Sequence, residues 1–143
     1  MEELSSLSAL IEQGYGEAED LNCAEKILRG ANKVYHLGLD TEALKLASGF
    51  GGGMAIGDKC GALTAAIMVL GRVFVKDCAH EDTKIKKLTK ELFDSYNKEM
   101  GSIDCIPLMA AHRTPEIKCR QVILKAAEVL DSIVLREKAG EGF

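Results

Sequence analysis

The feature that most constrains the fold is a glycine-rich segment, residues 49–61, that leads directly into an apolar segment. Six of the chain's 14 glycines lie between these positions. Glycine permits positive φ and lets other groups approach the backbone closely, so the segment predicts a sharply turning loop. The run that follows, 62–70, is apolar on almost every side, which is typical of a helix at the centre of a bundle.

The start of this apolar helix carries a candidate functional residue, Cys60. Asp58 is predicted to cap the helix, because its carboxylate can accept from the first free N–H groups. Cys60 would then lie in the first turn, where those N–H groups and the helix dipole favour a thiolate. The alternative is a buried cysteine that acts as a small hydrophobe. A phosphate-binding loop is excluded, since Asp58 stands where Lys would follow the second glycine.

Length and composition indicate one globular domain. The 143 residues are 47% hydrophobic and 28% charged, with no Trp and only two Pro. The net charge of -4 argues against a nucleic-acid-binding protein. The acidic start of the chain lacks a signal-peptide pattern, and the longest uncharged run is too short to span a bilayer. We therefore expect no membrane insertion and a cytoplasmic location, where clustered cysteines more often serve metal or redox chemistry than structural disulfides.

Apolar residues at helical spacing recur along most of the chain, and no alternating β-branched run predicts a strand. We expect residues 1–143 to form a single all-α domain, a bundle of about five or six helices with the glycine-rich loop before a central apolar helix. Asp20 and Asp40 are predicted caps, Thr114 and Pro115 predict a helix opening, and the tail from Arg136 is predicted to fray. The predicted helical segments are 4–17, 20–38, 40–47, 60–77, 81–100, a short turn near 107, and 114–135.

Four of the cysteines lie at or near predicted helix starts: Cys23, Cys60, Cys105 and Cys119. Helix openings can converge on one point, where dipoles and free N–H groups favour several thiolates, as an iron–sulfur or zinc site requires. No C-x-x-C pair occurs, and the spacing fits neither a ferredoxin nor a zinc finger. Spacing alone therefore leaves buried unlinked thiols as an alternative. Cys78, at the predicted C-terminal end of the central helix, lacks dipole support and is interpreted as structural.

The order of these cysteines, the glycine loop and the core 60–65 resemble the redox-active protein family named for its C…GCAxxG…C…C pattern. The resemblance covers most of the chain and implies Cys23, Cys60, Cys105 and Cys119 as the site. A similar domain in split-Soret cytochromes is associated with an iron–sulfur cluster, so the resemblance implies such a cluster, of the 2Fe–2S type, held by these four cysteines. The sequence departs from the pattern at Lys59 and Ala65, where the family has glycines. Lys59 adds a positive charge beside Cys60.

Three functions follow as hypotheses, and the sequence assigns no catalytic residue. The first is electron transfer to a redox partner protein through the iron–sulfur cluster. The second is a thiol/disulfide oxidoreductase or redox sensor in which Cys60 attacks and another of the four cysteines resolves. The third is a structural zinc site. His36, His80 and His112 are predicted at helix ends or loops, and His112 is a candidate spare ligand.

The apolar side chains inside the glycine loop are the last feature of interest. Phe50, Met54 and Ile56 either attach the loop to the core or form a contact patch beside Cys60. We predict a homodimer whose interface includes part of residues 49–57, because symmetric dimers are the commonest soluble oligomers.

Overall fold

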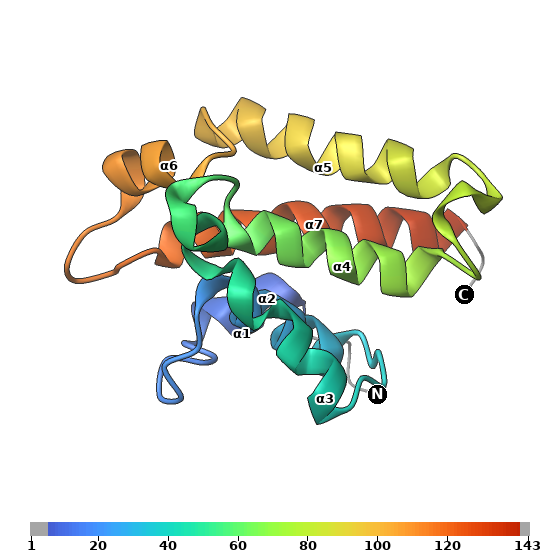
Figure 1. Cartoon of the computed structure of the whole chain (residues 1–143), viewed down its shortest axis with the longest axis horizontal. Helices are drawn as coiled ribbons and strands as arrows, with labels where there is room; N and C mark the ends of the chain where they lie inside the picture. The colour runs from blue at the N-terminus through green and yellow to red at the C-terminus, as the bar shows by residue number, and fades with distance from the viewer. Residues whose placement is uncertain (1–5, 141–143) are drawn as a thin grey trace.

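A computed structural model describes residues 6–140, and within this range the chain is all α (Figure 1). The only β-type pairings there are two isolated bridges, Lys59 with Asp104 and Thr114 with Lys118. None of the described helices is long and apolar enough to cross a membrane. The described helices, including short segments of other pitch marked η, are α1 (Leu7–Glu12), α2 (Cys23–Val34), α3 (Thr41–Leu44), η1 (Lys45–Phe50), η2 (Gly53–Gly57), α4 (Gly61–Phe74), η3 (Ala79–Glu81), α5 (Lys84–Met100), α6 (Cys105–His112) and α7 (Arg120–Gly140).

The predicted central helix is α4, which packs against α2, α5 and α7 (Figure 1). Its buried residues lie on nearly every side and include several alanines, which allow close approach of the neighbouring helices. α1 lies against α2 and α7 and closes the bundle on the side away from α5. The largest fully buried side chains are Tyr96, Leu7, Ile27, Leu28, Leu63, Leu70, Leu92, Leu108, Leu130, Ile133 and Val69.

Several predicted boundaries are confirmed. Asp40 caps α3 by accepting from the Ala43 N–H, and Gly101 ends α5 with a positive φ. α5 begins three residues later than predicted, at Lys84. The helix expected over 40–47 is only α3, and the chain then tightens into η1 before the glycine loop.

Other boundaries were wrong because local caps differ from the expected ones. The first helix, expected over 4–17, is the shorter α1; Leu4 lies outside the described residues. Asn22, not Asp20, caps α2 through a reciprocal capping box with Glu25. The tail does not fray at Arg136: α7 continues to Gly140, and the Arg136 guanidinium pairs with both carboxylate oxygens of Glu91.

Candidate functional site

The four cysteines of the predicted site lie at one end of the bundle, where α2, α4, α6 and α7 begin (Figure 1). Cys23 and Cys105 are the first residues of α2 and α6, Cys60 is the N-cap of α4, and Cys119 directly precedes α7. Four segments far apart in the sequence are thus brought to one place by their helix openings. Cys78 lies apart from them, exposed in the loop between α4 and α5, where it is the N-cap of η3.

Two backbone hydrogen bonds join the segment before α4 to the segment before α6. The Cys60 N–H donates to the Ile103 carbonyl at 2.9 Å, and the Cys105 N–H donates to the Asp58 carbonyl at 2.6 Å. Asp58 therefore contributes its main chain to this clamp and is not the predicted helix cap, a position that Cys60 occupies. The clamp fixes Cys60 and Cys105 relative to each other.

The loop before α4 is shaped by a run of left-handed residues. Gly52 and Gly53 have positive φ, as expected for glycine, but Met54 and Ala55 also have φ of 63° and 66°. A side-chain-bearing residue is strained in this conformation by about 1–2 kcal/mol. Strained backbone of this kind is found preferentially at functional sites.

Glycine at position 61 is required by close packing at the thiols. A Cβ atom at Gly61 would lie 2.7 Å from the Cys23 sulfur and 2.6 Å from the Phe50 carbonyl oxygen. A Cβ at Gly53 would come equally close to the Asp58 backbone and to the Cys105 side chain. The glycines thus let the chain pass directly over Cys23 and Cys105.

Burial and proximity set the protonation of these thiols. Burial raises the pKa of Cys60 to about 12, and negative charge on Cys23 and Cys105 adds to the effect. Burial likewise raises the pKa of Cys23 and of Cys105, with charge on Cys119 contributing to both. The thiols therefore lie within electrostatic range of one another, and without a cation they are held protonated.

The predicted thiolate at Cys60 is thus wrong for the free protein. Backbone N–H groups of Ala62 and Leu63 do lower the pKa of Cys60, as the helix-start argument expected, but burial outweighs them. Lys59 does not supply the expected support, because its amine lies 2.8 Å from Asp104 and 3.3 Å from Asp58. The alternative, a buried cysteine, is the one that the structure bears out, because Cys60 is 3% exposed.

Neighbouring side chains add to the site from α5 and α6. The Tyr96 hydroxyl donates to the Val122 carbonyl at 2.9 Å, and burial followed by the charges of Cys60, Cys119 and Cys23 raises its pKa. The Cys105 thiol donates to the Met109 sulfur at 3.6 Å. Within residues 6–140, no three His, Cys, Asp or Glu side chains are arranged to hold a metal ion.

Two prediction errors concern the segment before α7. Thr114 and Pro115 do not open a helix; the Thr114 hydroxyl accepts from the Ile117 N–H, forming a turn. Cys119 therefore precedes its helix and does not lie one turn within it. His112, the candidate spare ligand, ends α6 with its Nε2 atom 3.4 Å from the Met100 carbonyl oxygen.

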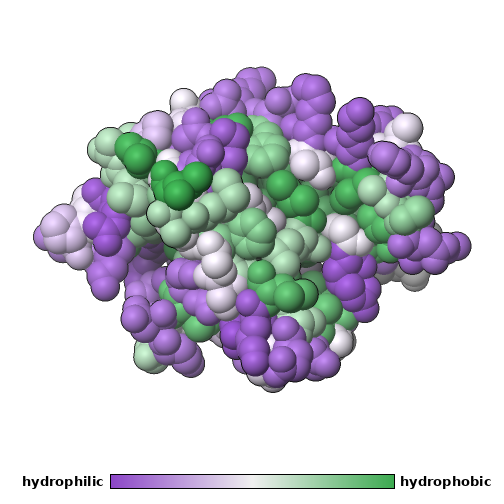
Figure 2. All heavy atoms as spheres, viewed as in Figure 1, coloured by the Kyte–Doolittle hydropathy of each residue, from purple (hydrophilic) through white to green (hydrophobic). Residues whose placement is uncertain are grey.

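The surface beside the thiols is apolar on one side and charged on the other. Near Cys105, exposed apolar side chains gather over η2 and α6, a region visible in Figure 2. We call this the apolar patch; its residues are Met54, Ile56, Ile106 and Met109. Near Cys23 and Cys119, a cavity of about 230 Å³ is lined by four cations and two carboxylates: Lys26, Arg113, Lys118, Arg120, Glu17 and Asp20.

The helical bundle and the thiols at its helix starts define a class, a small all-α domain with a cysteine-based redox motif. A family model described as "Putative redox-active protein (C_GCAxxG_C_C)" matches residues 21–133. The match covers most of the chain and includes all four clustered cysteines, so the chain belongs to this redox-active family, as the resemblance indicated. Neither the curated proteins nor the solved structures gave a match.

Proposed function

We propose that the protein transfers electrons through an iron–sulfur cluster, of the 2Fe–2S type, bound by Cys23, Cys60, Cys105 and Cys119. The observation that carries the proposal is the convergence of these four thiols at one end of the bundle. Burial first, and then charge repulsion from neighbouring thiols, raises the pKa of Cys23, Cys60 and Cys105. Iron supplies the positive charge that would offset this repulsion, and thiolates are its usual ligands in such clusters. The four thiols are thus of the ligand type that the cluster requires, although in residues 6–140 they are not arranged to hold a metal ion.

The chain itself would contribute protons, hydrogen bonds and exclusion of water. Each cysteine must lose its thiol proton on binding, so loading should release protons. The N–H groups of Gly52 and Ala24 lower the pKa of Cys23, and those of Ala62 and Leu63 lower that of Cys60. Such N–H groups stabilise negative charge on sulfur, and a bound cluster would pass one electron at a time.

Anaerobic reconstitution with iron and sulfide tests the proposal. We expect a coloured protein with stoichiometric iron and sulfide, and loss of both when each of the four cysteines in turn is replaced by Ser. Cys78→Ser is the matched control and should load as the parent does, because Cys78 is exposed and lies apart from the four cysteines. A colourless reconstituted protein, or equal loss in the control, would contradict the proposal.

The thiol/disulfide reaction and the structural zinc site remain the alternative proposals. The closeness of Cys23 and Cys60 favours the first, but their raised pKa values oppose an attacking thiolate. A thiol count that falls reversibly on oxidation would support it. Zinc would instead bind stoichiometrically without any redox response. In the cytoplasm, where we expect the protein to act, the thiols would stay reduced.

The apolar patch is proposed as the contact surface of a homodimer, extending the prediction for residues 49–57. Phe50 packs against the core, whereas Ile56 is 72% exposed and Ile106 is 60% exposed. Light scattering at high concentration should give the mass of a dimer for the parent and of a monomer for Ile56→Asp. A monomeric parent would contradict the homodimer. The apolar patch would then be a candidate contact surface for a separate redox partner protein.

A further inference from the structure

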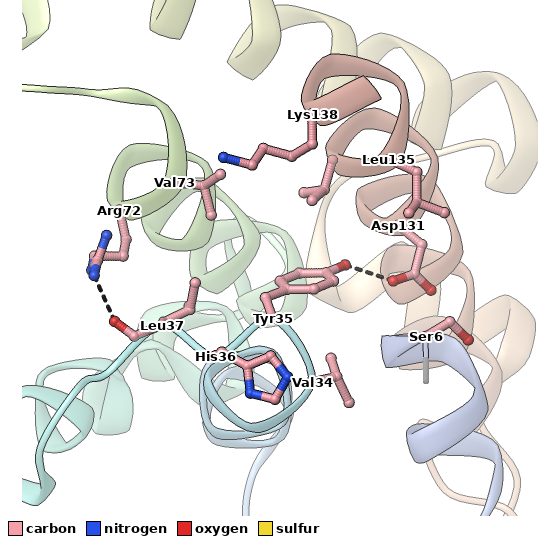
Figure 3. Close-up of a pocket in the computed structure, with 11 residues that line it drawn as sticks. Ser6, Val34, Tyr35, His36, Leu37, Arg72, Val73, Asp131, Leu135 and Lys138 are labelled. Atoms are coloured by element: carbon pink, nitrogen blue, oxygen red, sulfur yellow. Dashed lines mark hydrogen bonds between the residues drawn. The ribbon is translucent and has the colours of Figure 1, made fainter. Parts of the chain in front are cut away.

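A second cavity lies at the other end of the bundle, away from the thiols, between the C-terminal ends of α2, α4 and α7 (Figure 3). Its volume is about 350 Å³, within the range of pockets that hold small ligands. Val34, Val73 and Leu135 contribute apolar walls, and the Tyr35 ring lies at the centre. The cavity can therefore cover an apolar body about as large as one aromatic ring or a medium-length acyl chain.

The buried polar groups of this cavity are already satisfied. Asp131 is only 6% exposed, and its carboxylate accepts from the N–H groups of Leu7 and Ser8, both at 2.9 Å. It also accepts from the Tyr35 hydroxyl at 2.6 Å (Figure 3). Three donors thus offset the negative charge of Asp131. The Tyr35 ring faces the cavity, and its hydroxyl already donates to Asp131.

Nitrogen-bearing side chains stand around the rim. Arg72 donates one N–H to the Leu37 carbonyl at 2.7 Å and is otherwise exposed. Lys138 extends from α7 toward Val73 and Arg72 (Figure 3). His36 follows the last residue of α2 with φ of 57°, a left-handed conformation that non-glycine residues adopt infrequently, and it also lines the cavity.

We propose that this cavity binds a small organic acid. The apolar body would lie on the Tyr35 ring between α4 and α7, and the carboxylate would accept from Arg72 and His36. The assignment rests on the apolar walls, on the three donors that already satisfy Asp131, and on the Arg72 guanidinium and the His36 ring nitrogens at the rim. Among the described residues that line the cavity, an organic cation would find no unpaired carboxylate, and a fully hydrated inorganic anion would leave the apolar walls unused. The site does not depend on the function proposed for the cysteines.

Titration of the full chain with octanoate, 4-phenylbutyrate and indole-3-acetate, followed by backbone-amide NMR, tests the proposal. At least one acid should bind with a dissociation constant below about 1 mM. The shifted signals should be those of α2, α4 and α7 around Val34, Val73 and Leu135. Octylamine and octanol, which match octanoate in length, should bind more weakly or not at all.

Arg72→Gln should weaken binding of the acid about tenfold through loss of one charged contact, while folding is retained because Arg72 is exposed. Lys90→Gln is the matched control, since Lys90 lies on α5 outside the cavity and should leave binding unchanged. The proposal is overturned if no acid binds at this cavity. It is also overturned if octanol binds as well as octanoate, or if Arg72→Gln binds as the parent does.

Discussion

The two ends of the bundle handle buried polar groups in opposite ways. At the Asp131 end, one buried carboxylate has three hydrogen-bond donors, so the end is satisfied by the protein alone. At the cysteine end, several thiols lie close together and are held protonated by burial, to which the charges of neighbouring thiols add. The first arrangement stabilises the free chain, whereas the second is stable only while the thiols remain neutral or acquire a cation.

The largest effect should come from removing the carboxylate of the satisfied end. Asp131→Ala would leave the N–H groups of Leu7 and Ser8 and the Tyr35 hydroxyl without their acceptor, which should lower the free energy of unfolding by about 3–5 kcal/mol. Urea unfolding measures this loss. Tyr35→Phe removes one donor and should lower it by only about 1 kcal/mol. Asp94→Ala, at an exposed ion pair on α5, should change it little. Equal losses for Asp131→Ala and Asp94→Ala would contradict the claim that the three donors of Asp131 stabilise this end of the bundle.

At the cysteine end, the expected effect is a loss of stability at alkaline pH. The folded pKa of Cys60 is raised from 9.0 to about 12, so folding favours the protonated thiol. Its stabilising contribution is complete below pH 9 and is lost as the pH rises toward 12, by up to about 3–4 kcal/mol. Urea unfolding at pH 8 and pH 11 should show a smaller loss for Cys60→Ala than for the parent. Equal losses in the two proteins would show that Cys60 ionises as freely in the folded chain as in the unfolded one.

Crowding at the thiols predicts a smaller change. Gly61→Ala places a Cβ against the Cys23 sulfur and the Phe50 carbonyl, and such overpacking should lower the free energy of unfolding by about 1–3 kcal/mol. Gly71→Ala on the same helix is the control, because nothing lies within 4 Å of the added Cβ. Gly71→Ala should leave stability equal or slightly higher, because Ala favours a helix more than Gly does. A loss as large as at Gly61 would contradict the crowding argument.

The smallest effect is expected at Lys59. Its amine is held by Asp104 and Asp58, so Lys59→Gln should leave the alkylation rate of Cys60 within about twofold of the parent's. The rate is measured with iodoacetamide and mass spectrometry, and exposed Cys78 serves as the internal reference in the same sample. A much slower reaction of Cys60 in the variant would restore the idea that Lys59 supports its thiolate.

The sequence predicted the elements that depend on local patterns. The apolar run of α4, the cap at Asp40 and the placement of Cys23 at a helix start follow from spacing and capping chemistry. It failed where tertiary contacts decide: the Cys60 position is a helix start, but its burial depends on packing by segments far along the chain. Thr114 and Pro115 have helix-opening chemistry yet form a turn before α7.

The Asp131 end was missed, although the sequence contained a signal for it. Asp131 lies between Leu130 and Ile133 on the apolar stripe of α7, where a lone carboxylate at helical spacing indicates a buried and paired acid. The pairing itself was not predictable, because the donors lie in α1 and at the end of α2, far away in the sequence. Close approach at Gly61 was equally inaccessible, since it depends on where Cys23 and Phe50 lie.

The backbone clamp between the segments before α4 and α6 has a consequence for how such a chain can vary in length. α4 leads away from the clamp, the chain turns at 75–83, and α5 returns to it (Figure 1). Residues added at that turn would lengthen the separation of Cys60 and Cys105 in sequence without moving either sulfur. The interval between these two cysteines therefore carries no information about the site, and a fixed-spacing motif search is unsuited to sites built at the base of a helical hairpin.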